Sequence, residues 1–476
     1  MDRSELTPAQ AAYPYIDEFG WIGEMPATGR DRGQLLDQLK TIARQEDKRW
    51  EGGQCSGTMY SGDHELYGFI GNVFREFNHV NVLHRDICPS QTRFEGDILA
   101  MTLGMLHGDE VRKRDPVNRA GGVVTTGGSE SILSAILAHR DLYRAERGID
   151  RPELILPITA HPAHEKAADL FGIKVIRAPI DRDTTQVDLD FVKDHINANT
   201  IMLVGSAGNY PYGTVDPIEA LSDLALRHGI GLHIDGCLGG FILPWGEALG
   251  YDIPKFDFRL PGVTSISCDT HKFGYGPKGT SVVVVRDIAI RRHLYFIRTG
   301  WPGGRYASPG ISGSRSGGLH AATWAVMVSL GQEGYLERAR KIFSTADAMK
   351  ASIQKHNQLR LMGKPTFCIS FSSPEFNVYH VNDFMRARGW RFNGQQYPNA
   401  LHICVTGPQT QEGVAERFDS DLAEAVAYAN HPPREAPRTG AVYGGKGSEA
   451  DVDPNDVAAL RQSFVNYLDS MLDQPL

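Results

Sequence analysis

The sequence predicts an α/β fold with a mainly parallel sheet in a large domain, followed by a small C-terminal α+β domain. Between residues 121 and 285, short apolar runs alternate with amphipathic segments, as in chains that pass from strand to helix and back. Such alternation produces a mainly parallel sheet that is covered on both faces. After about residue 324 the pattern changes to one long helical segment and two strand–helix pairs, which predicts the smaller domain.

The elements of the large domain follow one another in regular order. Strands are expected at 121–128 (with a turn), 153–160, 173–180, 200–208 and 230–235. Helices are expected between them, and each candidate segment ends at a glycine, the usual residue beyond a helix C-terminus: 129–148, 162–172 and 217–229. Two more strands, separated by a glycine-rich turn, lie within 265–285, so the chain doubles back there.

The flanking regions differ from this repeating pattern. The N-terminal part predicts a helix at 30–53 and a loop at 55–65, and the C-terminal part a long helix at 324–354, strands at 366–373 and 400–406, and a helix at 381–389. A Pro/Gly-rich loop covers 431–450, and its one aromatic segment, 441–444, is expected to be ordered. We therefore expect an N-terminal segment at 1–75, a large domain at 76–325 and a small domain with its tail at 326–476.

Composition excludes several functional classes. The formal net charge of -8 argues against a nucleic-acid-binding protein, and no apolar run approaches the ~18 residues of a membrane span. The six cysteines form no CxxC pair, so we expect no metal site and reduced thiols, as in a cytoplasmic protein. The first ten residues lack the apolar core of a signal peptide. Export to a host cell is not readable from the sequence.

Polar residues stand where the predicted strands end, at Thr126, His161, Asp235 and Lys272. Ligands of parallel α/β sheets bind outside the carboxyl ends of the strands. We therefore expect these four positions to surround one site.

The first of these strand ends, VVTTGGSESILSAI, leads through two glycines into a helix. Backbone N–H groups at such a helix start form a phosphate cradle, and Gly128 and Ser129 are the candidate donors. The alternative is that Ser129 only caps an ordinary helix.

The next two strand ends carry a histidine and a carboxylate. His161 lies at a strand–helix junction, where its ring can stack on a flat ligand, although a surface or capping histidine is the alternative. Asp235 ends an apolar strand and is followed by glycines. A carboxylate in apolar surroundings needs a partner, and the N–H of a pyridinium ring would supply one; a turn or cap role is the alternative. His164 and Lys166 are weaker candidates.

The last strand end carries Lys272, in the stretch DTHKFGYGPKG. A lysine attacks carbonyl carbons when desolvation or nearby cations lower its pKa, but most lysines are simply solvated. Taken together, a phosphate cradle, a stacking histidine, a pyridinium carboxylate and a Schiff-base lysine are the groups that hold pyridoxal 5'-phosphate.

At these residues a family becomes recognisable. The chain resembles the fold-type-I pyridoxal-phosphate enzymes of the group II decarboxylase family, and within them the branch that cleaves sphingosine 1-phosphate in bacteria without a membrane anchor. The most specific matching pieces are CSGTMY, NVLHRD, TGGSESI, HIDGCLGGF, DTHKFGYGPKG and SGSRSGG. The resemblance runs from about residue 52 to residue 443. It implies a retro-aldol cleavage of the C2–C3 bond of phosphorylated sphingoid bases.

The resemblance also implies a role for individual residues. It supports the assignments of Lys272, Asp235 and His161 above, and of Gly128 and Ser129. It places His271 and Asn81 near the cofactor, and Gly313 and Ser314 at the cofactor phosphate of a neighbouring subunit, which implies a homodimer with shared sites. For substrate phosphate binding and catalysis it implies Tyr60, His84, Tyr210, Lys278 and the C-terminal Tyr443.

Two other functions stay open at this point. A pyridoxal-phosphate-dependent amino-acid decarboxylase would share the cradle, the aspartate and the His–Lys pair. A cofactor-free descendant of the fold, acting as a binding or scaffold protein, would keep the fold without the chemistry. The proton-abstracting base is also open, among Tyr210, His84, Tyr60 and the substrate phosphate.

Overall fold

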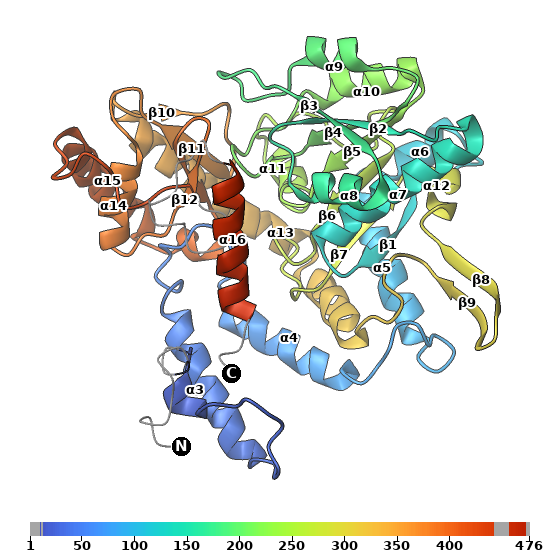
Figure 1. Cartoon of the computed structure of the whole chain (residues 1–476), viewed down its shortest axis with the longest axis horizontal. Helices are drawn as coiled ribbons and strands as arrows, with labels where there is room; N and C mark the ends of the chain where they lie inside the picture. Colours follow the sequence, from blue (N-terminus) through green and yellow to red (C-terminus); the bar gives the residue numbers. More distant parts are fainter. Residues whose placement is uncertain (1–9, 11–12, 442–456, 473–476) are drawn as a thin grey trace.

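The computed structural model describes residue 10, residues 13–441 and residues 457–472. Its centre is a seven-stranded sheet in the order β1-β7-β6-β5-β4-β2-β3 (Figure 1). The strands are β1 (Gly121–Thr125), β2 (Glu153–Pro157), β3 (Lys174–Ala178), β4 (Thr200–Ser206), β5 (Gly231–Asp235), β6 (Ser265–Cys268) and β7 (Ser281–Val285). All neighbours are parallel except β7, which runs antiparallel to both β1 and β6. The prediction of a mainly parallel α/β sheet, doubling back after β6, is confirmed.

The sheet separates two hydrophobic cores because successive strand residues point to opposite faces. Leu154 and Leu156 of β2 pack with α7 and α8 on one face, whereas Ile155 packs with α10 and α13 on the other. The helices of this domain are α7 (Gly128–Arg147), α8 (Ala163–Phe171), α9 (Leu189–His195), α10 (Ile218–His228), α11 (Leu243–Ala248) and α12 (Ile288–Arg292). The three predicted helices end as expected, with Gly148, Gly172 and Gly229 in the left-handed conformation after α7, α8 and α10.

A second, antiparallel sheet in the order β10-β11-β13-β12 forms the C-terminal part and lies to the left in Figure 1. Its strands are β10 (Arg360–Leu361), β11 (Cys368–Ser372), β12 (Asn393–Gln395) and β13 (Ala400–Cys404). The long helix α13 (Gly317–Gln354) leads from the large sheet to this part of the chain. The remaining C-terminal helices are α14 (Tyr379–Ala387), η2 (Gly407–Thr410), α15 (Val414–Asn430) and α16 (Val457–Leu472).

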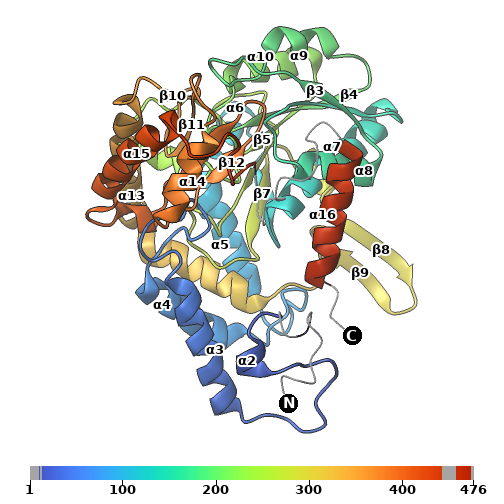
Figure 2. The same cartoon turned by 60° about the vertical axis from the view of Figure 1, so that its left-hand side comes forward.

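Helices α2 (Ile16–Phe19), α3 (Arg32–Asp47) and α4 (His64–Phe77) lie along one side of the molecule, below α13 in Figure 2. Helices α5 (Ser90–Met105) and α6 (Asp109–Arg114) follow them in the chain and lead to β1. Helix α4 packs along α13, and α5 packs against α13 and β1. No helix among the described residues has the length and apolar character needed to cross a membrane.

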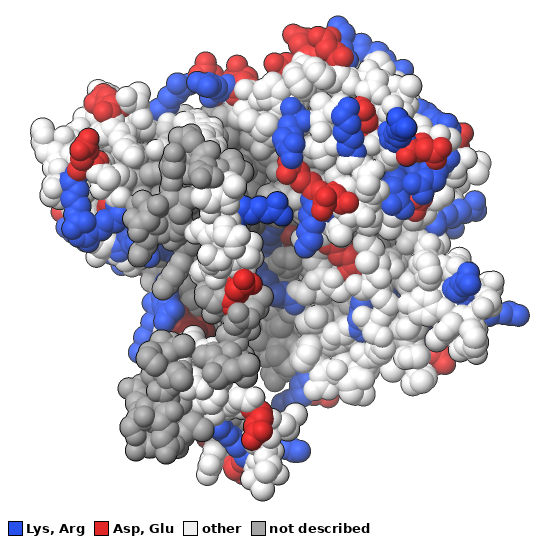
Figure 3. Space-filling view, viewed as in Figure 1, with Lys and Arg blue, Asp and Glu red and all other residues white. Residues whose placement is uncertain are grey.

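A two-stranded hairpin, β8 (Phe296–Trp301) and β9 (Gly304–Ser308), projects from the large domain (Figure 1). Its large side chains are unusually exposed for apolar residues: 58% for Phe296, 63% for Ile297 and 55% for Trp301. The surface over the hairpin is mainly uncharged in Figure 3, with basic side chains at its outer edge, whereas basic and acidic side chains alternate over the neighbouring helices. Exposed apolar surface of this kind is typical of a contact with another macromolecule.

Candidate active site

A cavity of about 280 Å³ lies at the carboxyl ends of the parallel strands. This volume is near the lower end of small-molecule sites, which begin at roughly 300 Å³. The structure brings eight of the predicted site residues to its wall: Tyr60, Gly128, Ser129, His161, Tyr210, Asp235, His271 and Lys272. These residues come from six separate segments of the chain, so only the folded sheet assembles them.

Lys272 follows β6 and enters the cavity with its amine paired. Its Nζ lies 2.7 Å from Oδ2 of Asp269, and only 3% of the Asp269 side chain is exposed. Burial favours the neutral amine, but the Asp269 carboxylate outweighs it and raises the pKa of Lys272 well above its usual value. In the protein without cofactor, Lys272 is therefore held as an ammonium ion.

Asp269 is a functional candidate that the sequence interpretation missed. It stands three residues before Lys272, and the turn after β6 carries both side chains toward the same cavity. Its Oδ1 is buried without a hydrogen-bond partner among the described residues. The spacing of an acid three residues before the lysine was the available signal.

Replacing Asp269 by asparagine is expected to lower the pKa of Lys272, because desolvation is then no longer opposed by the carboxylate. More of the amine is neutral at a given pH, so the cofactor absorbance should develop at lower pH than in the wild type. The test follows the rate of colour development after adding pyridoxal phosphate to apoprotein across the pH range. Asp257→Asn, which removes a buried carboxylate paired with Arg259, is the control; an unchanged pH midpoint in Asp269→Asn would contradict this role.

Asp235 ends β5 and is 8% exposed. Its Oδ1 accepts a hydrogen bond of 3.0 Å from the Cys237 N–H, so it does take part in a turn, as the alternative interpretation held. Burial favours the neutral acid, but His164 and His161, together with this hydrogen bond, hold the pKa of Asp235 below its usual value. An ionised carboxylate in the wall of a cavity is suited to pair with a protonated ring nitrogen.

His161 lines the same cavity between β2 and α8. Its Nδ1 accepts a hydrogen bond of 3.1 Å from the backbone N–H of Ala163, which assigns the ring proton of the neutral form to Nε2. Burial lowers the pKa of His161, which favours this neutral form. A neutral, fixed imidazole can stack on a flat ligand without repelling a cationic ring.

The turn after β1 is built as a cradle. The N-cap of α7 is Gly127, with no side-chain cap, so the interpretation of Ser129 as an N-cap is wrong. The helix starts at Gly128, whose backbone approaches Asp269 so closely that an added Cβ would lie 2.7 Å from Oδ1. The first-turn N–H groups of α7 lie at the positive end of a 20-residue helix, where a phosphate binds favourably.

Lys278 stands beside the cavity and does not line it. Its Nζ lies 4.7 Å from the ring centroid of Tyr60 and donates a 3.1 Å hydrogen bond to the carbonyl of His271. Partial burial and the neighbouring Lys272 ammonium lower the pKa of Lys278 to about 8.

Two tyrosines line the cavity. Burial raises the pKa of Tyr60, so its phenol stays protonated. Tyr210 stacks on His402 of β13, at a centroid distance of 4.5 Å.

Besides Lys278, four other described residues from the predicted set lie outside this cavity: Asn81, His84, Gly313 and Ser314. Asn81 Nδ2 donates a 2.9 Å hydrogen bond to Ser314 Oγ, and both His84 and Ser314 are exposed. The loop of Gly313 and Ser314 is tied to the cradle helix by the neighbouring residue: the Ser312 N–H donates a 2.9 Å hydrogen bond to Glu130. Tyr443, the remaining predicted residue, lies outside the described residues.

The cavity fits a flat, polar, anionic ligand. Besides the predicted residues it is lined by Ile132, Ser206, Gly208, Asn209, Cys237, Leu238 and Asp269, none of which the sequence singled out. Asn209 Nδ2, like Asp269 Oδ1, is buried without a partner among the described residues, and such atoms normally have one. A phosphate cradle, a fixed imidazole, an ionised carboxylate and a lysine amine in one wall are the donor set for pyridoxal phosphate.

Known proteins match this chain along most of its length. The family model of the pyridoxal-dependent decarboxylase conserved domain matches residues 24–372. The sphingosine-1-phosphate lyase of Arabidopsis thaliana is 42% identical over 444 residues, which cover 92% of this chain and 79% of the plant protein. Sphingosine-1-phosphate lyase 1 of Rattus norvegicus is 38% identical over 451 residues, covering 94% and 77%.

Solved structures give the same relationship. A sphingosine-1-phosphate lyase of Burkholderia pseudomallei superposes with a TM-score of 0.91 at 57% identity, covering 97% of this chain and all of that one. A glutamate decarboxylase of Lactobacillus brevis, with a TM-score of 0.72 at 20% identity over 90% of this chain and 99% of its own, shares the fold alone. The chain therefore belongs to the pyridoxal-dependent decarboxylase family and, within it, to the sphingosine-1-phosphate lyases.

Proposed function

We propose that this protein cleaves the C2–C3 bond of phosphorylated sphingoid bases, such as sphingosine 1-phosphate, to a long-chain aldehyde and phosphoethanolamine. The observation that carries the proposal is a second cation beside the cavity that Lys272 lines, which we call the lysine cavity. Lys278 contacts the ring of Tyr60, a residue that lines that cavity together with Lys272. The first lysine serves the cofactor and the second is free to serve a substrate phosphate.

The site residues divide the work of holding the cofactor. Pyridoxal phosphate, when bound, supplies an electron sink for the electron pair released as the C2–C3 bond breaks. Lys272 would hold its carbonyl carbon, and the Gly128–Ser129 cradle and His271 would hold its phosphate. Asp235 would keep its ring nitrogen protonated, and the neutral His161 imidazole would stack on the ring.

The substrate phosphate is assigned to Lys278, with Tyr60 beside it. A flexible ammonium suits a phosphate as a point charge, and a phenol that stays protonated is a hydrogen-bond donor. The raised pKa of Tyr60 also argues against Tyr60 as the base that removes the proton of the 3-hydroxyl group. Tyr210, in the cavity wall, and His84 are the remaining side-chain candidates for this base.

The experiment that tests the function incubates purified protein and pyridoxal phosphate with a phosphorylated sphingoid base. Long-chain aldehyde and phosphoethanolamine should appear in equal amounts. Parallel reactions with glutamate and with aromatic amino acids, scored for carbon dioxide, test the decarboxylase alternative. Carbon dioxide release without aldehyde would overturn the proposal.

We further propose that two copies of the chain share their active sites. The cluster around Asn81, His84 and Ser314 is on the surface and does not line the cavity of its own chain. The exposed apolar hairpin β8–β9, which immediately precedes the loop of Ser314, offers surface for a second copy. We also propose a cytoplasmic location, in keeping with six cysteines that form no disulfide.

The shared site predicts complementation between two inactive variants. Lys272→Ala and His84→Ala homodimers should both be impaired, but a mixed dimer contains one site with an intact lysine from one chain and an intact histidine from the other. Co-expression with two affinity tags and tandem purification isolates this dimer. It should regain up to half of the wild-type activity, since one of its two sites is intact. A mixed dimer no more active than its parents would place His84 in the site of its own chain or outside the reaction.

A further inference from the structure

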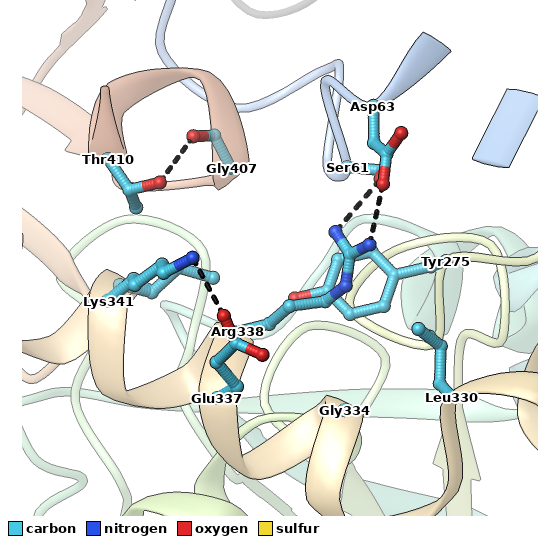
Figure 4. A pocket seen from close by; sticks show the side chains of 11 residues that line it. Ser61, Asp63, Tyr275, Leu330, Gly334, Glu337, Arg338, Lys341, Gly407 and Thr410 are labelled. Carbon is cyan, nitrogen blue, oxygen red and sulfur yellow. Dashed lines mark hydrogen bonds and ion pairs between the residues drawn. The ribbon is translucent and has the colours of Figure 1, made fainter. Parts of the chain in front are cut away.

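A second cavity, of about 350 Å³, lies where helix α13, the turn η2 and the N-terminal segment meet (Figure 4). None of the residues predicted for the cofactor or the substrate lines it. Its charged side chains come in two pairs: Arg338 with Asp63, and Lys341 with Glu337. The first pair joins separate segments, whereas the second lies within one helix.

Arg338 extends from α13 between two loops that both lead to the active site. Its Nη2 lies 2.8 Å from Oδ2 of Asp63, and its Nη1 donates a 3.3 Å hydrogen bond to Oγ of Ser61. On its other side, the guanidinium carbon lies 5.1 Å from the ring centroid of Tyr275. Figure 4 shows the guanidinium group directed at Asp63, with the Tyr275 ring alongside it.

The first loop, residues 60–63, carries Tyr60 into the wall of the lysine cavity. Arg338 holds Ser61 and Asp63, the first and third residues after Tyr60. The carbonyl of Tyr60 accepts a 2.9 Å hydrogen bond from the Gly407 N–H of η2. Asp63 also caps α4, since its Oδ1 accepts a 3.1 Å hydrogen bond from Leu66. The Tyr60 loop therefore reaches its position through contacts made behind the cavity.

The second loop is the lysine turn, residues 269–276. Tyr275 adopts a left-handed conformation (φ 60°), which is strained for a residue with a large side chain, and is 4% exposed. Its N–H donates a 3.0 Å hydrogen bond to the carbonyl of Lys272. The stacked guanidinium of Arg338 thus packs against the residue that closes the turn behind Lys272.

We propose that Arg338 is a positioning residue that holds Tyr60 at the correct distance from Lys272, by clamping the Tyr60 loop to the lysine turn. This inference rests on the proposed function, since it assumes that Tyr60 acts on the substrate of the lysine cavity. Arg338 lines the second cavity but not the cavity that contains Lys272. A guanidinium suits the task because its planar fork bonds two acceptors while its face packs on a ring.

The test compares Arg338→Gln with the control variant Lys341→Gln. Lys341 lies on the next turn of α13 and lines the same second cavity, but its ion pair with Glu337 is made within the helix. Arg338→Gln should keep the cofactor absorbance of Lys272 and lose about tenfold to a hundredfold in kcat on a phosphorylated sphingoid base. Lys341→Gln should keep both. Equal kcat in wild type and Arg338→Gln would overturn the proposal.

A double-mutant cycle separates positioning from a general loss of stability. If Arg338 acts through Tyr60, Arg338→Gln should add little to the loss already caused by Tyr60→Phe. Fully multiplicative losses would overturn the proposal even if Arg338→Gln is impaired. Arg338→Lys keeps the charge but not the fork, and should recover only part of the activity. Failure of the wild-type protein to cleave the substrate would overturn the proposed function. Multiplicative losses of activity in the double-mutant cycle would overturn only the role of Arg338, so the two failures can be told apart.

Discussion

Replacing Lys272 by alanine is expected to abolish turnover of the phosphorylated sphingoid base and to remove the cofactor absorbance at ~420 nm. Covalent attachment through a lysine has no substitute in this cavity: among the described residues that line it, Lys272 is the only lysine. We expect activity to fall by at least about 10³-fold, the scale of losing a group that takes part in the chemical steps. Absorbance spectra and an aldehyde assay measure the two effects on the same preparation.

The same substitution has a structural cost that must be separated from the chemical one. It leaves the Asp269 carboxylate buried beside an empty space, where its partner ammonium had been 2.7 Å away. Removing one member of a buried pair lowers the free energy of unfolding by about 3 kcal/mol, and we expect this lower end of the usual range because 25% of the Lys272 side chain is exposed.

A second variant isolates the chemistry. Lys272→Ala combined with Asp269→Asn removes the unpaired charge and should recover stability in thermal unfolding while staying colourless and inactive. Lys166→Ala, which removes an exposed lysine of α8, is the control for loss of a lysine as such. Turnover or colour retained in Lys272→Ala would contradict the assignment.

The parallel core of the fold could be predicted from the sequence because its strands are short apolar runs and its helices end at glycines. Helix α5 was not predicted, and its buried side reveals why. Gln91, Glu95 and Thr102 are buried on this helix, so the apolar periodicity that marks an amphipathic helix is interrupted. Glu95 tolerates burial because Arg315, 220 residues away, and Arg85, in the loop before the helix, pair with it and hold its pKa at about 2. No local pattern contains that information.

The candidate site, like the fold, could be predicted only in part. Three of the four strand-end residues, His161, Asp235 and Lys272, line the cavity as predicted, because the carboxyl ends of parallel strands converge. The prediction was wrong for Thr126, which does not line the cavity and whose N–H donates a hydrogen bond to Glu130. The side chains that support the site residues could not be predicted. Asp269 meets Lys272 only through the conformation of the turn between them, and Arg338 meets the Tyr60 loop across 275 residues of chain. The hairpin β8–β9 also escaped prediction, since its exposed apolar residues follow no buried pattern.

Lys278→Ala is expected to separate cofactor binding from substrate binding. The variant should keep the absorbance at ~420 nm, because Lys278 lies beside Tyr60 and outside the cavity that holds Lys272. It should lose about 2–5 kcal/mol of interaction with the substrate phosphate, which corresponds to a fall of about 30- to 5,000-fold in kcat/KM. Lys255→Ala, which removes an exposed lysine that lines neither cavity, should change neither quantity.

The pH dependence of the wild type tests the same assignment from another direction. Burial, the larger cause, and the Lys272 ammonium lower the pKa of Lys278 to about 8 in the protein without cofactor, so its side chain is an ammonium ion below this pH and becomes neutral above it. Since kcat/KM reports the ionisation of the free enzyme, it should fall as the pH rises through about 8. Lys278→Arg keeps a positive charge in this range and should lose that limb of the profile. A basic limb that persists unchanged in Lys278→Arg would mean that another group causes it, and wild-type kcat/KM in Lys278→Ala would exclude Lys278 from the phosphate site.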